Sequence, residues 1–163
     1  MPERTLVGRM IGAATLDVPT YEDVEHDETA TVQAGLVVVL AAVAQGVASP
    51  YSGVIYGIVS SLLGWMALAG LTYFIGTRLF EGTATWGELL RTLGFATAPG
   101  ILHILGIIPV LGWLVSLAVT IWVLTCVVVA IRQALDITTG KAVLTGVLGM
   151  IAWVIIAAVV PGL

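Results

Sequence analysis

Charge is what this chain has least of. Only 10% of its 163 residues are charged, whereas soluble domains average about 25%. Hydrophobic residues make up 59% of the sequence, and the mean hydropathy is +1.09. Several apolar runs approach the ~20 residues that cross a bilayer as a helix. These proportions exclude a soluble domain and predict a single polytopic integral membrane domain.

Cysteine, basic patches and catalytic signatures are rare or missing too. The single cysteine, Cys126, lies in an apolar run and cannot form an internal disulfide, so we expect it to pack as a small hydrophobic side chain. A net charge of −4 without a basic patch argues against nucleic acid as a partner. No nucleophile–base pair, zinc signature or phosphate-binding loop is present. The sequence therefore predicts neither an enzyme nor a bound cofactor.

Residues 1–30 are predicted to form an amino-terminal segment in two parts. In residues 2–16, Leu6, Met10 and Ala13 fall near one helical face, which fits either a short helix in the headgroup region or a frayed terminus. The second part is acidic and contains no Lys or Arg. Its six carboxylates belong to Asp17, Glu22, Asp23, Glu25, Asp27 and Glu28. An anionic leaflet would repel them, so we expect this part to be solvated and to stand away from the membrane.

Two local signals lie within the acidic part. Pro19 followed by Thr20-x-x-Asp23 indicates a helix start with a weak capping box. His26 lies among the carboxylates, where oxygen ligands could hold a divalent cation. The spacing does not match an EF-hand, and acidic segments are commonly solvated without a cation. The sequence therefore predicts no metal site.

Five membrane spans account for the rest of the chain. Apolar runs place them at about residues 31–48, 54–77, 89–108, 112–131 and 142–160. Pro50, Pro109 and Pro161 are expected to lie in the turns or ends that close three of these spans. In the second span, Gly57 and Ser61 have a four-residue spacing that favours close helix packing within the bundle. The predicted fold is an all-α bundle of five transmembrane helices over residues 31–163.

The third span carries the most local information. Thr85 and Glu88 form a Thr-x-x-Glu capping box, and Trp86 sits where a residue of the aromatic belt would. Pro99 removes one backbone hydrogen bond and crowds the carbonyl of Phe95, so this helix is predicted to bend at Pro99. The small residues around Pro99 would let another helix pack against the bend.

Few polar side chains lie inside the spans. Gln45 is the strongly polar residue of the first span, and His103 is the only ionisable side chain well inside a span. Such a group is a functional candidate by default, but a proton relay needs a second titratable group at depth, and the chain has none. A neutral His103 bonded to a carbonyl freed by Pro99, or to Gln45, is the favoured interpretation. Gln45, Pro99 and His103 are the candidate intramembrane polar site.

The distribution of charge tests the number of spans. When the flanks of five spans are assigned alternately to two sides, all six basic and all ten acidic residues fall on one side. The connections on the opposite side carry no charge. By the positive-inside rule, the amino terminus is cytoplasmic and the carboxyl terminus lies outside. Four or six spans would not separate the charges in this way.

A family resemblance is carried mostly by the second half of the chain. Five spans, an acidic amino-terminal segment and the sequence WGELLRTLGFATAPGILHILGIIPVLG at residues 86–112 resemble the Yip family of Ypt/Rab-GTPase-interacting membrane proteins, most closely its bacterial members. The segment VAIRQALDITTGKA at residues 129–142 adds to the likeness, which covers about residues 16–160. Family membership implies a five-span fold. In eukaryotic members it also implies cytoplasmic contacts with prenylated GTPases, and with one another, in membrane traffic. A bacterial member would lack a Rab-type partner, and its location would be the plasma membrane.

Three functions stay open. The favoured one is a non-enzymatic scaffold or adaptor for membrane organisation or trafficking, which binds protein partners through its cytoplasmic face. Its candidate contact residues are the six acidic side chains above together with Arg91 and Arg132. The alternatives are a small transporter or channel that uses the broken third helix, and an accessory subunit of a larger membrane complex. The expected partners are membrane lipids and a protein, either a second copy of the chain or a member of such a complex.

Overall fold

The computed structural model describes residues 5–48, 54–108 and 111–159 of the chain. Throughout these residues the fold is helical. The elements are α1 (Leu6–Ala14), α2 (Val18–His26), α3 (Ala30–Ala48), α4 (Val54–Leu79), α5 (Trp86–Ala96), the 3₁₀ helix η1 (Ala98–Ile107), α6 (Gly112–Ala134) and α7 (Thr139–Val159). Five stretches are long and apolar enough to cross a membrane, with α5 and η1 forming one of them. The prediction of an all-α fold with five spans is confirmed.

The ends of several spans differ from the predicted ones. Helix α6 continues to Ala134, past the predicted end at Ile131, and α7 already begins at Thr139. Thr139 and Gly140 therefore belong to a helix, although they precede the predicted start of the fifth span at residue 142. A glycine is tolerated there because the N–H groups of a first helical turn have no intrahelical partners to lose. Pro50, Pro109 and Pro161 lie outside the described residues.

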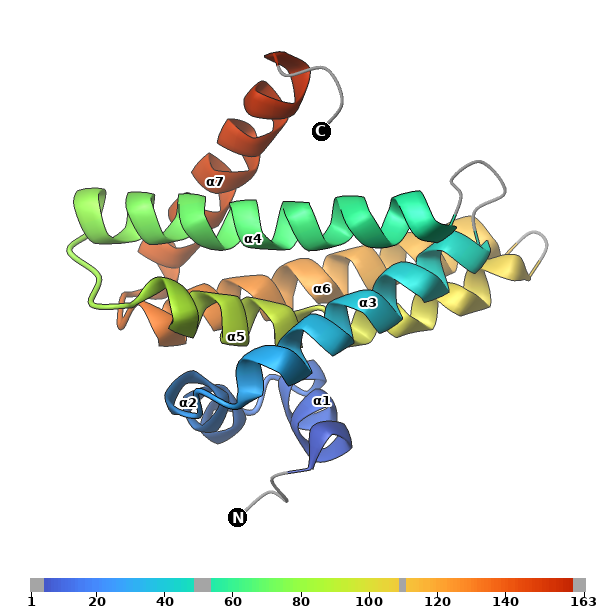
Figure 1. Cartoon of the computed structure of the whole chain (residues 1–163), viewed down its shortest axis with the longest axis horizontal. Helices are drawn as coiled ribbons and strands as arrows, with labels where there is room; N and C mark the ends of the chain where they lie inside the picture. The colour runs from blue at the N-terminus through green and yellow to red at the C-terminus, as the bar shows by residue number, and fades with distance from the viewer. Residues whose placement is uncertain (1–4, 49–53, 109–110, 160–163) are drawn as a thin grey trace.

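The third span lies at the centre of the bundle. In Figure 1, α3, α4, α6 and the third span run along the long axis of the molecule, whereas α7 leaves them obliquely in this view. Half of the most apolar window of the third span is buried, against 6% for α4. Helix α4 is therefore peripheral, and most of its side-chain surface is left for lipid.

Helix α3 packs against the third span at small residues. A Cβ atom added to Gly94 would lie 2.6 Å from the Cβ of Ala34, and one added to Gly100 would lie 3.1 Å from the Cβ of Ala41. Small residues allow this approach of two backbones, as expected in lipid. By contrast, no neighbour lies within 4 Å of a Cβ added to Gly57 in α4. The close packing that the sequence suggested at Gly57 is absent from the described part of the chain.

The chain accommodates Pro99 by a change of helix type. The α-helix α5 ends at Ala96, Thr97 is its C-cap, and the 3₁₀ helix begins at Ala98 with Pro99 in its first turn. Proline is well tolerated in a first turn, because its missing N–H would have no partner there. A 3₁₀ run of ten residues is unusual, since most runs stop after about 3–4. The third span therefore contains two helices of different winding.

The charged flanks of the spans meet at one end of the bundle. Helices α3 and α7 begin there, α4 and α6 end there, and α5 starts there (Figure 1). Helices α1 and α2 pack against α5 and α6 at this end. We call this region the charged end and define it as residues 5–29, 78–91 and 132–141.

Candidate functional site

Helix α2, which contains the predicted contact residues Glu22, Asp23 and Glu25, starts earlier than the sequence suggested. The N-cap is Asp17, whose carboxylate accepts hydrogen bonds from the Thr20 amide at 3.1 Å and from the Thr20 hydroxyl at 2.6 Å. Pro19 lies in the first turn, where its missing N–H costs nothing. Thr20 was predicted as the start of the helix, but it lies within the helix and is buried. Asp is among the strongest N-cap residues, which explains why the helix begins after Asp17 and not at Thr20.

A buried arginine of α1 holds α2 in place. The side chain of Arg9 is 3% exposed and binds Asp23 and Asp27, with the shortest nitrogen–oxygen distances at 2.9 and 2.6 Å. A third hydrogen bond, of 3.1 Å, runs from Arg9 to Gln33 in α3. Burial lowers the pKa of Arg9, but the hydrogen bonds to Asp27 and Asp23 outweigh it and raise that pKa above its ordinary value. Hydrogen bonds from Thr29 and Arg9 lower the pKa of Asp27 to about 2.

The carboxyl-terminal turn of α1 is anchored by side chains from other helices. The Tyr21 hydroxyl donates to the carbonyl of Ala13 at 3.0 Å, and the indole N–H of Trp122 donates to the carbonyl of Ala14 at 2.7 Å. The Cys126 thiol lies 3.6 Å from the Ala13 carbonyl as a weak donor. The last carbonyls of a helix lack intrahelical partners, so these donors satisfy them. Burial raises the pKa of Tyr21 above its ordinary value, which keeps its proton available as a donor.

Arg91 of α5 anchors the carboxyl-terminal turn of α2 by donating hydrogen bonds to its carbonyls. Its guanidinium donates hydrogen bonds of 3.0 Å to the carbonyls of Val24 and Glu25, and its second nitrogen, Nη2, makes a further contact with the Glu25 carbonyl. Arg91 is 7% exposed. A cation at a helix carboxyl terminus also interacts favourably with the helix dipole. Arg91, predicted as a contact for a partner, is therefore an internal residue that docks α2 on the third span.

Further hydrogen bonds connect the remaining parts of the charged end. Gln133 of α6 donates to Glu22 at 2.7 Å and accepts from Arg132 at 2.8 Å. The amide of Thr83 donates to the carbonyl of Leu135 at 3.2 Å, and the Thr83 hydroxyl donates to Asp136 at 3.1 Å. The acidic segment is thus a docked helix and not the solvated segment that the sequence suggested. The reason is that its carboxylates and carbonyls find partners far away in the chain.

Only some of the predicted contact residues remain open to a partner. Glu28 is exposed, and Asp17, Glu22, Asp23, Asp27 and Arg132 are partly exposed. Glu25 is 7% exposed, and its Oε2 atom has no hydrogen-bond partner among the residues that the structure describes. Burial and the neighbouring Glu22 raise the pKa of Glu25 to about 7. Among the described residues, the exposed charges beyond the eight candidate contacts include Arg78, Glu81, Asp136 and Lys141.

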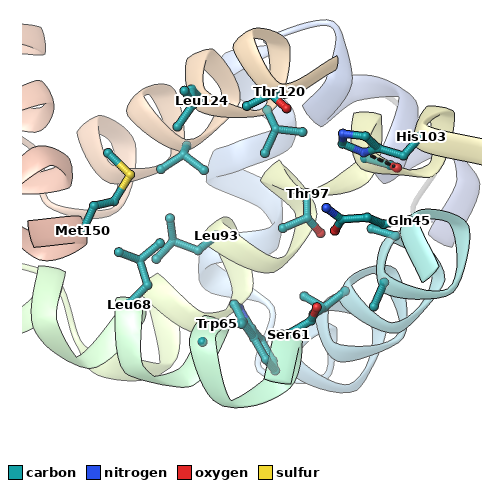
Figure 2. Close-up of a pocket in the computed structure, with 17 residues that line it drawn as sticks. Gln45, Ser61, Trp65, Leu68, Leu93, Thr97, His103, Thr120, Leu124 and Met150 are labelled. Carbon is teal, nitrogen blue, oxygen red and sulfur yellow. Dashed lines mark hydrogen bonds between the residues drawn. The ribbon is translucent and has the colours of Figure 1, made fainter. Parts of the chain in front are cut away.

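The predicted intramembrane site borders a cavity between the spans. This cavity has a volume of about 360 Å³ and is lined mostly by apolar side chains, with Gln45, Ser61, Thr97, His103 and Thr120 as polar members. In Figure 2 the amide of Gln45 points toward Thr97, and His103 lies on the η1 side of the cavity. Pro99 is buried and does not line the cavity.

His103 makes a hydrogen bond within its own helix. Its Nδ1 atom lies 2.9 Å from the carbonyl oxygen of Gly100, one turn earlier in η1, as the dashed line in Figure 2 shows. The partner is neither Gln45 nor the Phe95 carbonyl, which were the two expected from the sequence. A 3₁₀ helix places residues i and i+3 above one another, so the ring reaches this carbonyl without leaving its helix.

These observations define a class: a five-span helical membrane protein whose charged residues, where described, form a folded cap on one end of the bundle. The Yip1 domain model matches residues 17–160 of the chain. The protein therefore belongs to the Yip1 family, and the resemblance noted in its sequence is confirmed. No curated protein sequence and no solved structure matches the chain significantly.

Proposed function

We propose that this Yip1-family protein is a non-enzymatic membrane adaptor that binds a protein partner at its charged end. The observation that carries the proposal is the cross-bonded construction of this end, in which Arg9, Arg91 and Gln133 join α1, α2, α5 and α6. A surface that is already ordered loses less conformational entropy when a partner binds. The positive-inside rule places the charged end in the cytoplasm.

The charge of this end specifies the kind of partner. Its described residues include nine acidic side chains (Asp17, Glu22, Asp23, Glu25, Asp27, Glu28, Glu81, Glu88 and Asp136) and five basic ones (Arg9, Arg78, Arg91, Arg132 and Lys141). The excess is negative, so a partner with a basic surface fits. Complementary charge of this kind speeds the encounter and sets specificity more than it sets affinity. Binding should weaken as salt rises, because exposed charges are screened.

Photo-crosslinking from defined positions tests the adaptor function. A photoreactive amino acid is placed at Glu28, Glu81 or Lys141, which are exposed at the charged end, and at Trp113, which is exposed at the start of α6 on the opposite end. We expect one protein, in stoichiometric yield, to crosslink from the first three positions and not from Trp113. Crosslinks from Trp113 alone, or to lipid from all four positions, would overturn the proposal.

A charge variant then tests whether the contact is electrostatic. The combined variant Glu28→Gln, Glu81→Gln and Asp136→Asn neutralises exposed carboxylates and spares those that hold α2. Asn at residue 136 also suits the left-handed backbone there, with φ of 53°. We expect the crosslinked partner to be lost from this variant and retained by His103→Asn, whose change lies within a span.

One observation favours a transporter as the second candidate. The cavity at Gln45, Thr97 and His103 lies within the spans and is large enough for a small solute. Against it, none of the described residues that line the cavity is an Asp, Glu, Lys or Arg that could select an ion. Solute flux into liposomes that is abolished by His103→Ala would favour this candidate, and the absence of flux would favour the adaptor.

A further inference from the structure

Three side chains on one face of α2 carry donor atoms for a metal ion. Glu22, Glu25 and His26 have the spacing i, i+3 and i+4, which places them side by side on a helix. One donor atom from each of the three lies within 4.8 Å of the others. The sequence placed His26 among carboxylates but did not indicate which of them lie beside it. The structure does, because α2 is helical there and brings Glu22 and Glu25 to the side of His26.

The carboxylate of Glu25 lacks the partner that a buried charge requires. Glu25 is only 7% exposed, and its Oε2 atom has no hydrogen-bond partner in the described residues. The hydrogen bonds of the nearby Arg91 run to the backbone carbonyls of Val24 and Glu25 instead. A buried, unpaired carboxylate is costly unless it is protonated, paired or bound to a metal. The neighbouring carboxylate of Glu22 adds repulsion, as the raised pKa of Glu25 reflects.

His26 is oriented as metal-binding histidines usually are. Its Nδ1 atom lies 2.8 Å from the backbone carbonyl oxygen of Glu22. A carbonyl can only accept, so Nδ1 carries a proton, and in the neutral imidazole Nε2 keeps the lone pair. Metal-ligating histidines typically donate their second ring N–H to a carbonyl or carboxylate in this way, which fixes the tautomer. The side chain of His26 is exposed, so a cation can reach it from solvent.

We propose that Glu22, Glu25 and His26 bind one divalent transition-metal ion, with Zn²⁺ as the probe of that class. Two carboxylate oxygens and one imidazole nitrogen suit such an ion better than Ca²⁺ or Mg²⁺, which take oxygen ligands. Tetrahedral Zn²⁺ with ligands at about 2.0–2.2 Å needs donor atoms roughly 3.4 Å apart. The three donor atoms lie within 4.8 Å of one another, so binding requires the side chains to close slightly around the ion. Water completes the fourth position.

Zinc titration of the full-length protein tests the site. The protein is purified in detergent without a polyhistidine tag, stripped with a chelator and titrated with ZnCl₂ in excess Mg²⁺. We expect one Zn²⁺ per chain. We also expect Glu25→Gln and His26→Gln to bind at least tenfold more weakly, since even the loss of a partner that only supports a metal ligand costs about 10–100-fold. The matched control is Glu28→Gln, which removes a nearby exposed carboxylate outside the group and should bind as the wild type does.

The variant His26→Gln separates loss of a metal ligand from damage to the fold, because His26 is exposed. Glu25 is buried, so Glu25→Gln could weaken binding by disturbing α2, whereas His26→Gln changes an exposed side chain. Unchanged zinc affinity in His26→Gln would overturn the proposal, as would a wild type that binds no Zn²⁺ in excess Mg²⁺. Neither result bears on the adaptor function, because partner crosslinking is measured separately in metal-free buffer.

Discussion

The charged end and the opposite half of the bundle are held together differently. At the charged end, side-chain hydrogen bonds cross from one helix to another, as those of Arg9, Arg91 and Gln133 do. In the described residues of 41–64, 98–121 and 146–159, the side-chain hydrogen bonds of Ser60, His103 and Thr120 return to their own helices. There, helices associate by the fit of apolar surfaces.

This difference indicates which part of the molecule fixes how the helices are arranged relative to one another. In lipid, no hydrophobic effect drives apolar helices together, so their packing depends on the complementary shape of the two surfaces. Directional bonds to buried charges specify one arrangement, because any other leaves a charge without a partner. We therefore expect single polar substitutions to loosen the charged end locally, and changes in the opposite half to matter only where backbones touch.

Arg9→Ala should have the largest effect. Removing one member of a buried ion pair costs about 3–5 kcal/mol, because the remaining charges lose their partner. We expect the lower part of that range, since the side chains of Asp23 and Asp27 are 29% exposed. Denaturation in mixed micelles measures the loss. Hydrogen exchange should show deprotection of α1 and α2 but not of α4.

The control for Arg9→Ala is Arg78→Ala, since Arg78 is exposed. Its expected change is within about 0.5 kcal/mol, as for most surface substitutions. Equal losses in the two variants would mean that the charged end is not held by the Arg9 ion pairs.

Arg91→Ala should have the second-largest effect and lower the free energy of unfolding by about 2–3 kcal/mol. The reason is that it leaves the buried carbonyls of Val24 and Glu25 without their charged donor. Arg91→Lys keeps the charge but loses the planar fork that reaches two carbonyls, so we expect a loss between the wild type and Arg91→Ala. Chemical denaturation of the three proteins gives the order. An Arg91→Lys variant as stable as wild type would show that charge alone, and not the fork, docks α2.

Gly94→Ala tests the packing of the spans. The added methyl would lie 2.6 Å from the Cβ of Ala34 and 3.1 Å from its backbone, and overpacking of this kind costs about 1–3 kcal/mol. The matched variant Gly57→Ala adds the same methyl where no neighbour lies within 4 Å, and it should be neutral or up to about 1 kcal/mol more stable. Thermal unfolding in detergent compares the two. If they were equally stable, close contact of α3 with the third span would be refuted.

Thr85→Ala should have the smallest effect, about 1 kcal/mol, because it removes the N-cap of α5. The capping box is formed by the Glu88 amide donating to the Thr85 hydroxyl at 3.3 Å and the Thr85 amide donating to Glu88 at 2.8 Å. Thr120→Ala is the control, because Thr120 is exposed and binds only the carbonyl of Ser116 in its own helix. Thermal unfolding should rank Thr120→Ala closer to the wild type.

Features that depend on a few neighbouring residues could be predicted from the sequence. The capping box at Thr85 and Glu88 is confirmed, because its partners are three residues apart. The five spans are confirmed as well, because each is a continuous apolar run. The helix α2 was indicated, but its N-cap was assigned to Thr20 because the stronger cap, Asp17, lies before the proline that marked the helix start.

The candidate site was harder to predict because its bonds join distant residues. Arg9 reaches Asp27 across 18 positions, Arg91 reaches Val24 across 67, and Gln133 reaches Glu22 across 111. A signal for Arg91 was present, since the predicted third span begins at residue 89 and an arginine in the first turn of a span needs a polar partner. The sequence could not say that the partner was the end of α2.

By itself, the sequence determined the number of spans, the helical class and the placement of the described charged residues at one end. Hydropathy and capping act within one stretch of chain, and the apolar solvent forces each such stretch into a helix. Only the tertiary structure decided that the acidic segment folds back on the bundle, that Arg9 and Arg91 are buried, and that Glu25 is buried beside Glu22 and His26. Those outcomes depend on which distant groups satisfy a buried charge, and that choice is made only when the helices have come together.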